Sequence, residues 1–133
     1  MKQMLSIVTF LSVILIFVGC TGKPYLFENP VDEIERIEIV SAENSLEFTV
    51  TKTLSETEKE DFLEQFQMIK FDSYYLGDPM SIHGDAVKIT YRNGDYEMIC
   101  HYWAEYVKNG EVYFVWKSCD EDDFNNLLNN FLE

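Results

Sequence analysis

The fold is decided by the stretch "DAVKITYRNGDYEMICHYWAEYVKNGEVYFVWK", residues 85–117. Two Asn-Gly pairs, Asn93-Gly94 and Asn109-Gly110, divide it into three runs rich in β-branched and aromatic residues. Asn-Gly between such runs is the strongest short-range signal for a β-hairpin. The stretch therefore predicts three consecutive antiparallel strands, over residues 85–92, 95–107 and 111–117.

A two-residue turn at Asn93-Gly94 would determine which side chains share a face of the first hairpin. The cross-strand pairs are then Tyr91 with Tyr96, Ile89 with Met98 and Val87 with Cys100 on one face, and Arg92 with Asp95 and Thr90 with Glu97 on the other. The first face is apolar and the second is charged, as a sheet with one buried side requires. We therefore expect these residues to point inward together: Met98, Cys100, Tyr102, Ala104 and Tyr106.

Two registers are open for the second hairpin. A two-residue turn at Asn109-Gly110 pairs Trp103 with Trp116 on the face opposite Cys100, together with Phe114. A three-residue turn with a glycine bulge moves the pairing by one residue, which puts Trp116 in the core and leaves Trp103 outside. In both registers at least one tryptophan lies on the outer face of the sheet.

This outer face is the candidate binding surface. Its candidate residues are Trp103, His101, Glu105 and Trp116. Exposed aromatic patches usually mark contact surfaces, and tryptophan and tyrosine dominate the residues that carry binding energy. The alternative is that the N-terminal segment, a loop or the edge of another element covers the patch.

The remaining strands and the element order follow from the same alternation. Alternating apolar and polar residues predict strands over residues 34–41 and 45–53, and "FDSYYL", residues 71–76, predicts a short one. With one helix after the second strand and one at the end, the order is ββα–ββββ–α. We expect an α+β fold: an antiparallel sheet of about five to six strands, with two amphipathic helices packed on one face.

Both helices carry start signals. Ser55 and Glu58 have the spacing of a capping box, and the helix that they open continues towards residue 70. Ser118 and Glu121 repeat that spacing before the last helix. Helical spacing predicts two buried stripes, Phe62, Phe66 and Ile69 in the first helix and Phe124, Leu127, Leu128 and Phe131 in the second.

The N-terminus, "MKQMLSIVTFLSVILIFVGC", is typical of a lipoprotein export signal. Its apolar run, residues 5–18, is shorter than the roughly 20 residues of a membrane span. We expect residues 1–19 to be a signal peptide, Cys20 to be lipidated, residues 20–30 to be a tether and residues 31–133 to be one domain. Phe17 stands where such signals more often have leucine. The alternative is an uncleaved anchor helix; both place the remaining chain outside the cytoplasm.

The charge of the chain limits its partners. The 133 residues carry a formal net charge of −14, with a pI near 4.4. Such a domain repels nucleic acid and anionic lipid headgroups, so membrane attachment would depend on the lipid at Cys20. A basic protein or peptide is the partner that this charge favours. The alternative is that the charge only keeps the domain soluble.

Few residues suggest a catalytic or metal-binding site. His83 lies in the loop "GDPMSIHG", residues 77–84, close to Asp78 and Asp85, but these three do not have a recognised metal-ligand spacing. No catalytic motif is present, so we expect a non-enzymatic protein that needs no metal or cofactor. An enzyme that acts from the loop at residues 77–85 is the alternative.

The two cysteines of the domain, Cys100 and Cys119, flank the second hairpin. Export permits a disulfide between them. If Ser118 caps the last helix, however, Cys119 is its first residue and has left the alternation of the strand. We therefore expect no disulfide, with a lowered thiol pKa at Cys119 near the positive end of the helix.

Three segments together resemble a known group of proteins. The export signal ending at Cys20, the hairpin "GDAVKITYRNGDYEMI" and the helix "SCDEDDFNNLL" look like those of small, uncharacterised lipoproteins of Gram-positive bacteria. The layout is also similar to the β-lactamase-inhibitor-protein-like fold, in which the open sheet face binds a protein. We expect a palmitate-carrying lipoprotein on the outer side of the cell membrane that binds a protein or peptide; an immunity or inhibitor protein against a basic toxin or lytic enzyme is an alternative.

Overall fold

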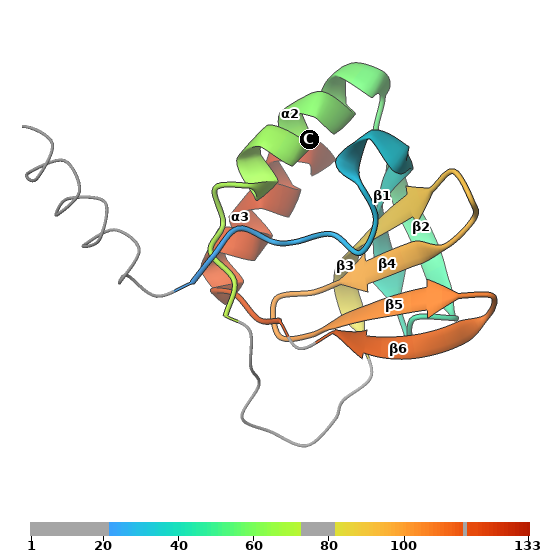
Figure 1. The fold of residues 1–133 in the computed structure, drawn as a ribbon. Helices are drawn as coiled ribbons and strands as arrows, with labels where there is room; N and C mark the ends of the chain where they lie inside the picture. The colour runs from blue at the N-terminus through green and yellow to red at the C-terminus, as the bar shows by residue number, and fades with distance from the viewer. Residues whose placement is uncertain (1–21, 73–81, 116) are drawn as a thin grey trace, which may run out of the picture.

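The computed structural model describes residues 22–72, 82–115 and 117–133. Its elements, in chain order, are η1 (Val31–Glu33), β1 (Ile34–Ala42), β2 (Phe48–Thr53), α2 (Glu56–Phe66), β3 (Gly84–Tyr91), β4 (Tyr96–Ile99), β5 (Ala104–Lys108), β6 (Glu111–Val115) and α3 (Glu121–Leu132). The strands form one antiparallel sheet in the order β2-β1-β3-β4-β5-β6 (Figure 1). The predicted α+β class and the order ββα–ββββ–α are confirmed.

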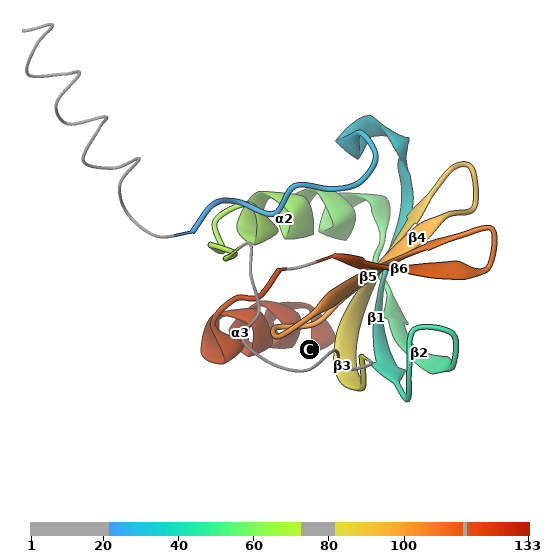
Figure 2. The ribbon, with the colours of Figure 1, turned by 60° about the horizontal axis from the view of Figure 1, so that its bottom comes forward.

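Both helices cover the same face of this sheet (Figure 2). Phe62 and Phe66 of α2 and Leu128 of α3 are buried against Ile37 and Ile89 of the sheet. The predicted capping box is present, because the Ser55 side chain accepts from the Glu58 amide and the Glu58 carboxylate accepts from the Ser55 amide. The helices therefore form as their apolar stripes predict, and they close one side of the sheet.

The start of α3 differs from its prediction. The N-cap is Asp120, whose carboxylate accepts from the Asp123 amide at 3.0 Å. The predicted cap, Ser118, instead exchanges two backbone hydrogen bonds with Asp72, of 2.8 and 3.1 Å. This pairing keeps the chain extended to residue 118, so the helix begins two residues later than the Ser118 spacing predicts.

The register predicted for the first hairpin is wrong by one residue. Thr90 pairs with Tyr96 and Ile89 with Glu97, so the turn contains three residues and ends at Gly94 with φ 92°. The Asn93 side chain accepts from the Asp95 amide at 2.9 Å, which stabilises the longer turn. A shift of one residue moves every side chain of β4 to the other face. Glu97 therefore lies on the helix side, and Met98 lies on the opposite side.

The single strand predicted over residues 95–107 is two strands joined by a turn. Residues 100–103 reverse the chain, with the Cys100 amide bonded to the Trp103 carbonyl at 2.9 Å, and Ile99 pairs with Ala104. On one straight strand Cys100 and Trp103 would point to opposite faces. The reversal places both in a second buried cluster, on the face away from the helices: Val40, Ala42, Ile82, Ala86, Met98, Cys100 and Trp103.

The second hairpin adopts the two-residue turn. Val107 pairs with Val112, and Asn109 and Gly110 have φ of 53° and 79°. Positive φ at both central residues is the type I′ geometry that Asn-Gly favours. In this register Phe114 lies directly opposite Glu105 of β5, so the two side chains are on the same face of the sheet. The predicted partner of Trp103, Trp116, is outside the described residues.

The segment predicted as a tether is part of the folded domain from residue 22. Lys23 pairs with Phe71 through two backbone hydrogen bonds, and Tyr25 and Phe27 are buried beside Phe66 of α2. The prediction of a free tether over residues 20–30 is therefore wrong for residues 22–30. Of the strand predicted over residues 71–76, the first two residues form isolated bridges and the others lie outside the described part. Within the described residues, each helix is too short or too polar to span a bilayer.

Candidate functional site

Trp103, the first candidate anchor, lies inside the molecule. Its side chain has an exposed fraction of 0%. Its ring packs edge-on against Phe114, with ring centres 5.5 Å apart, and its Nε1 donates to the Glu105 carboxylate at 3.2 Å. The prediction that Trp103 is exposed on an open sheet face is therefore wrong. Its role is to pack the face that has no helix.

Glu105 is also buried, so the prediction that it lies on an open binding face is wrong. Its carboxylate accepts from Trp103 and from the Ser45 hydroxyl, and the Ser45 carbonyl accepts from the Tyr96 hydroxyl at 2.7 Å. Ser45 belongs to the loop between β1 and β2, which are distant from β5 in the sheet order. The sheet must curl for these contacts to form, and its curl closes the predicted binding face.

His101 and His83 lie on two sides of Tyr102. The His101 ring packs edge-on against Tyr102 with centres 4.9 Å apart, and its Nε2 is 3.9 Å from the Glu121 carboxylate. The Tyr102 hydroxyl is 2.9 Å from Nδ1 of His83. Asp85 is exposed in β3, whereas Asp78 and Trp116 lie outside the described residues. Among the residues that are described, no three side chains are arranged to hold a metal ion.

Cys100 and Cys119 are free thiols in the structure. Burial raises the pKa of the Cys100 thiol to about 11 and that of the Cys119 thiol to about 12. The lowered pKa predicted for Cys119 is wrong, because the residue precedes the helix, is partly buried and lies near Asp120 and Asp123, whose charges raise its pKa further. The absence of a disulfide in the exported protein stays a prediction.

A buried carboxylate that sequence reasoning missed lies on the helix side of the sheet. Glu97 accepts hydrogen bonds from the hydroxyls of Tyr25, at 2.6 Å, and Tyr91, and from the Glu28 amide at 3.1 Å. Burial raises its pKa, although the two hydroxyls oppose that shift. Because Tyr25 and Glu28 precede η1, this carboxylate joins the N-terminal segment to the sheet. The sequence did not indicate this site, because the register predicted for the first hairpin placed Glu97 on a solvated face.

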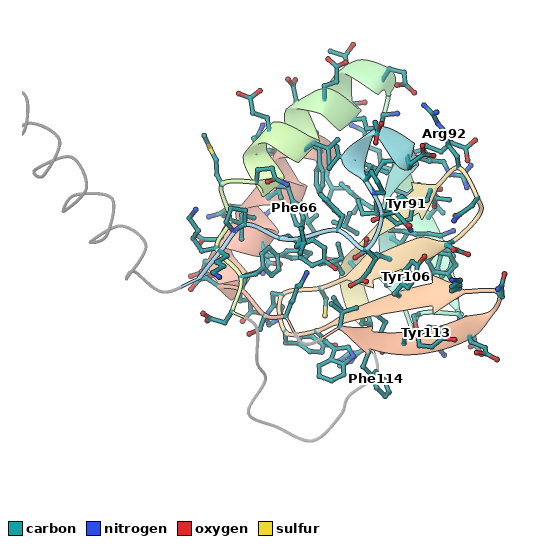
Figure 3. The ribbon with its side chains drawn as sticks, viewed as in Figure 1. Phe66, Tyr91, Arg92, Tyr106, Tyr113 and Phe114 are labelled. Carbon is teal, nitrogen blue, oxygen red and sulfur yellow. The ribbon has the colours of Figure 1, made fainter. Side chains whose placement is uncertain are left out.

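The exposed aromatic side chains of the described part of the sheet lie instead on one of its two edge strands, β6. Tyr113 has an exposed fraction of 49% and Phe114 of 55%. Figure 3 shows both at the free edge of the sheet, with Phe114 beyond the ribbon of β6. Tyr113 borders an open depression that is also lined by Glu28, Tyr106 and Glu111, and its hydroxyl donates to Glu111 at 2.8 Å. This edge, defined by Glu111–Val115, is the candidate functional site.

No family model, curated protein or solved structure matches this chain. The resemblance to small lipoproteins therefore stays a prediction from the residues.

The edge combines three features that suit recognition of an extended chain. Apolar side chains are exposed on both faces of β6, the carboxylates of Glu28 and Glu111 lie on one of these faces, and β6 pairs only with β5 among the described strands. Exposed sheet edges with such side chains commonly accept a peptide or another strand. Of the predicted binding residues that the structure describes, none forms this edge; Phe114, which one register placed on the outer face, does.

Proposed function

We propose that this protein is an extracytoplasmic lipoprotein, held at the outer side of the cell membrane by a lipid on Cys20, that binds a basic peptide or protein segment and catalyses no reaction. The anchor is supported by the export signal that ends at Cys20. The binding function is carried by one observation, the exposure of Tyr113 and Phe114 next to each other on an edge strand.

Charge supports a basic partner. The chain has a formal net charge of −14, and the depression beside Tyr113 is lined by two acidic residues, Glu28 and Glu111, and one basic residue, Lys108. A cationic segment would be drawn to this surface, and apolar contact with Phe114 would then hold it there. An immunity or inhibitor protein would use the same recognition with a basic toxin or lytic enzyme as its partner.

Replacing Cys20 by alanine should abolish lipid attachment. We expect cells that express the full chain to incorporate labelled palmitate into the wild type and not into Cys20→Ala, and the variant should leave the membrane fraction. Cys100→Ala is the matched control, because it removes a buried thiol and leaves Cys20 intact. Equal labelling of wild type and Cys20→Ala would contradict the anchor.

Replacing Phe114 by serine should weaken binding of a basic peptide. With the full chain in detergent and a peptide of alternating lysine and valine, we expect the dissociation constant to rise about tenfold, since burial of a large apolar side chain contributes at least 1.5 kcal/mol. Leu46→Ser is the control, because Leu46 has the same exposed fraction of 55% but lies in the β1–β2 loop. Equal weakening by both substitutions would contradict the assignment of the site to β6.

A further inference from the structure

We propose that the partner binds to β6 by strand addition, as an extended peptide that pairs with the backbone of Val112 and Phe114 and alternates apolar and basic side chains. This inference rests on the proposed function and adds the mode of binding and the pattern of the ligand.

The register of the β5–β6 hairpin determines which backbone groups are free. With a two-residue turn at Asn109-Gly110, Lys108 and Glu111 form a hydrogen-bonded pair, and such pairs alternate along the hairpin. Tyr113 and Val115 therefore direct their amide and carbonyl groups towards β5. The residues that alternate with them, Val112 and Phe114, direct their amide and carbonyl groups away from the sheet, where an added strand would form hydrogen bonds with them.

The two edges of the sheet differ in how well they are protected against pairing with an added strand. The other edge, β2, has a register shift where it meets β1 between Ile39 and Val40. Its Lys52 side chain lies against the helices, bonded to the Glu58 carboxylate at 2.6 Å and to the Phe131 carbonyl at 2.5 Å. Bulges and lysines are devices that protect sheet edges. Residues 112–115 of β6, Val-Tyr-Phe-Val, include neither a charged residue nor proline.

The side chains of β6 define the pattern of the ligand. Phe114 lies on the face of Trp103, which it contacts, and Tyr113 lies on the other face, with Glu28 and Glu111. Residues of an added strand that lie opposite Phe114 would meet an apolar surface, and their neighbours in sequence would meet a surface on which the acidic residues Glu28 and Glu111 outnumber the basic Lys108. An alternation of apolar and basic residues satisfies both faces.

Charge also favours a foreign peptide over a second copy of this chain. Pairing two copies through β6 would bring together two molecules with a formal net charge of −14 each, and would place Glu28 and Glu111 near those of the other copy. A cationic strand gains from the same charges.

Amide hydrogen exchange of the full chain in detergent tests the proposal directly. The probe is a synthetic peptide of about six residues, a usual strand length, that alternates lysine and valine. We expect its addition to protect the amides of Val112 and Phe114 and to leave those of Phe48 and Val50, at the other edge, unchanged. Tyr113 should already be protected without the peptide, because its amide bonds to β5.

Proline substitution provides a second measurement. Val112→Pro removes an outward amide without removing a bond to β5, so we expect affinity for the peptide to fall by about tenfold, as loss of one hydrogen bond allows. Val50→Pro is the matched control on β2. Val50 pairs with Val40 of β1, and Val112 likewise pairs with Val107 of β5. A peptide methylated on its backbone nitrogens should lose affinity, whereas a glutamate–valine peptide should not bind.

The outcomes separate this inference from the proposed function. If the lysine–valine peptide binds without protecting Val112 or Phe114, strand addition is wrong and the proposed function stands. If it does not bind at all, both are wrong. Protection of the two amides that grows with protein concentration in the absence of peptide would identify a second copy as the occupant and overturn the proposal.

Discussion

Trp103→Ala should lower the free energy of unfolding by about 3–5 kcal/mol, the usual cost of removing a buried aromatic side chain. Trp103 is fully buried, contacts Phe114 and donates to the Glu105 carboxylate. The substitution leaves a cavity and removes one of the donors to a buried charge. Because a domain of this size is stable by only about 5–15 kcal/mol, the loss is a large fraction of the total. Urea denaturation monitored by circular dichroism measures it.

Phe114→Ala is the control for Trp103. The two rings contact each other, but Phe114 is more than half exposed, so we expect its removal to change stability by less than about 1 kcal/mol. The two substitutions should therefore separate stability from binding, with Trp103 governing the first and Phe114 the second. A Trp103→Ala variant of wild-type stability that fails to bind the basic peptide would restore Trp103 as an exposed anchor.

Glu97→Ala should destabilise the domain by at least about 2 kcal/mol, because two buried hydroxyls lose their acceptor at about 1 kcal/mol or more each, and a part-buried amide loses its acceptor as well. These donors are the hydroxyls of Tyr25 and Tyr91 and the amide of Glu28. These hydrogen bonds between the N-terminal segment and the sheet are lost, whereas the bond from Asn29 to the Tyr106 hydroxyl remains. Thermal unfolding, together with hydrogen exchange of residues 22–30, measures both effects.

Glu97→Gln is the matched variant, and it should change the pH dependence of stability. Burial raises the pKa of Glu97 in the folded protein above its ordinary value of about 4.5, so the folded state binds this proton more tightly than the unfolded state does. Ionisation of Glu97 therefore lowers stability as pH rises from about 4.5 through the folded-state pKa. Glutamine keeps one acceptor oxygen and does not ionise. We expect the variant to gain stability relative to the wild type over this range.

The comparison of unfolding free energies between pH 4.5 and pH 7 decides this prediction. A difference between wild type and Glu97→Gln that does not change with pH would show that Glu97 titrates at its unfolded value. A change in the opposite direction would show that the hydrogen bonds from Tyr25 and Tyr91 outweigh its burial. Both results would contradict the role of burial described for this carboxylate.

Local patterns in the sequence predicted both helices, both Asn-Gly hairpins and the order of helices and strands. The Asn109-Gly110 turn, the Ser55–Glu58 capping box and the apolar stripes of α2 and α3 depend on residues within a few positions of one another, so their geometry follows from local sterics and hydrogen bonding. The class of the fold follows in turn, because consecutive hairpins and two one-sided helices have few ways to bury their apolar faces.

Contacts between distant residues decided what local patterns could not. Asn93-Gly94 is compatible with turns of two or three residues, and the choice of three moved Glu97 to the helix side, where Tyr25 supplies a hydrogen bond from 72 residues away. The turn at residues 100–103 and the curl that brings Ser45 to Glu105 bury Trp103, although its position on an alternating strand indicates an exposed ring.

The candidate site shows the same division. The sequence by itself determined that the β5–β6 hairpin turns at Asn109-Gly110 and that Phe114 can lie on the outer face of the sheet. Only the tertiary structure decided that β6 is an edge strand, that Trp103 is buried and that Phe114 is exposed. Exposure depends on what the rest of the chain covers, and that is a property of long-range packing.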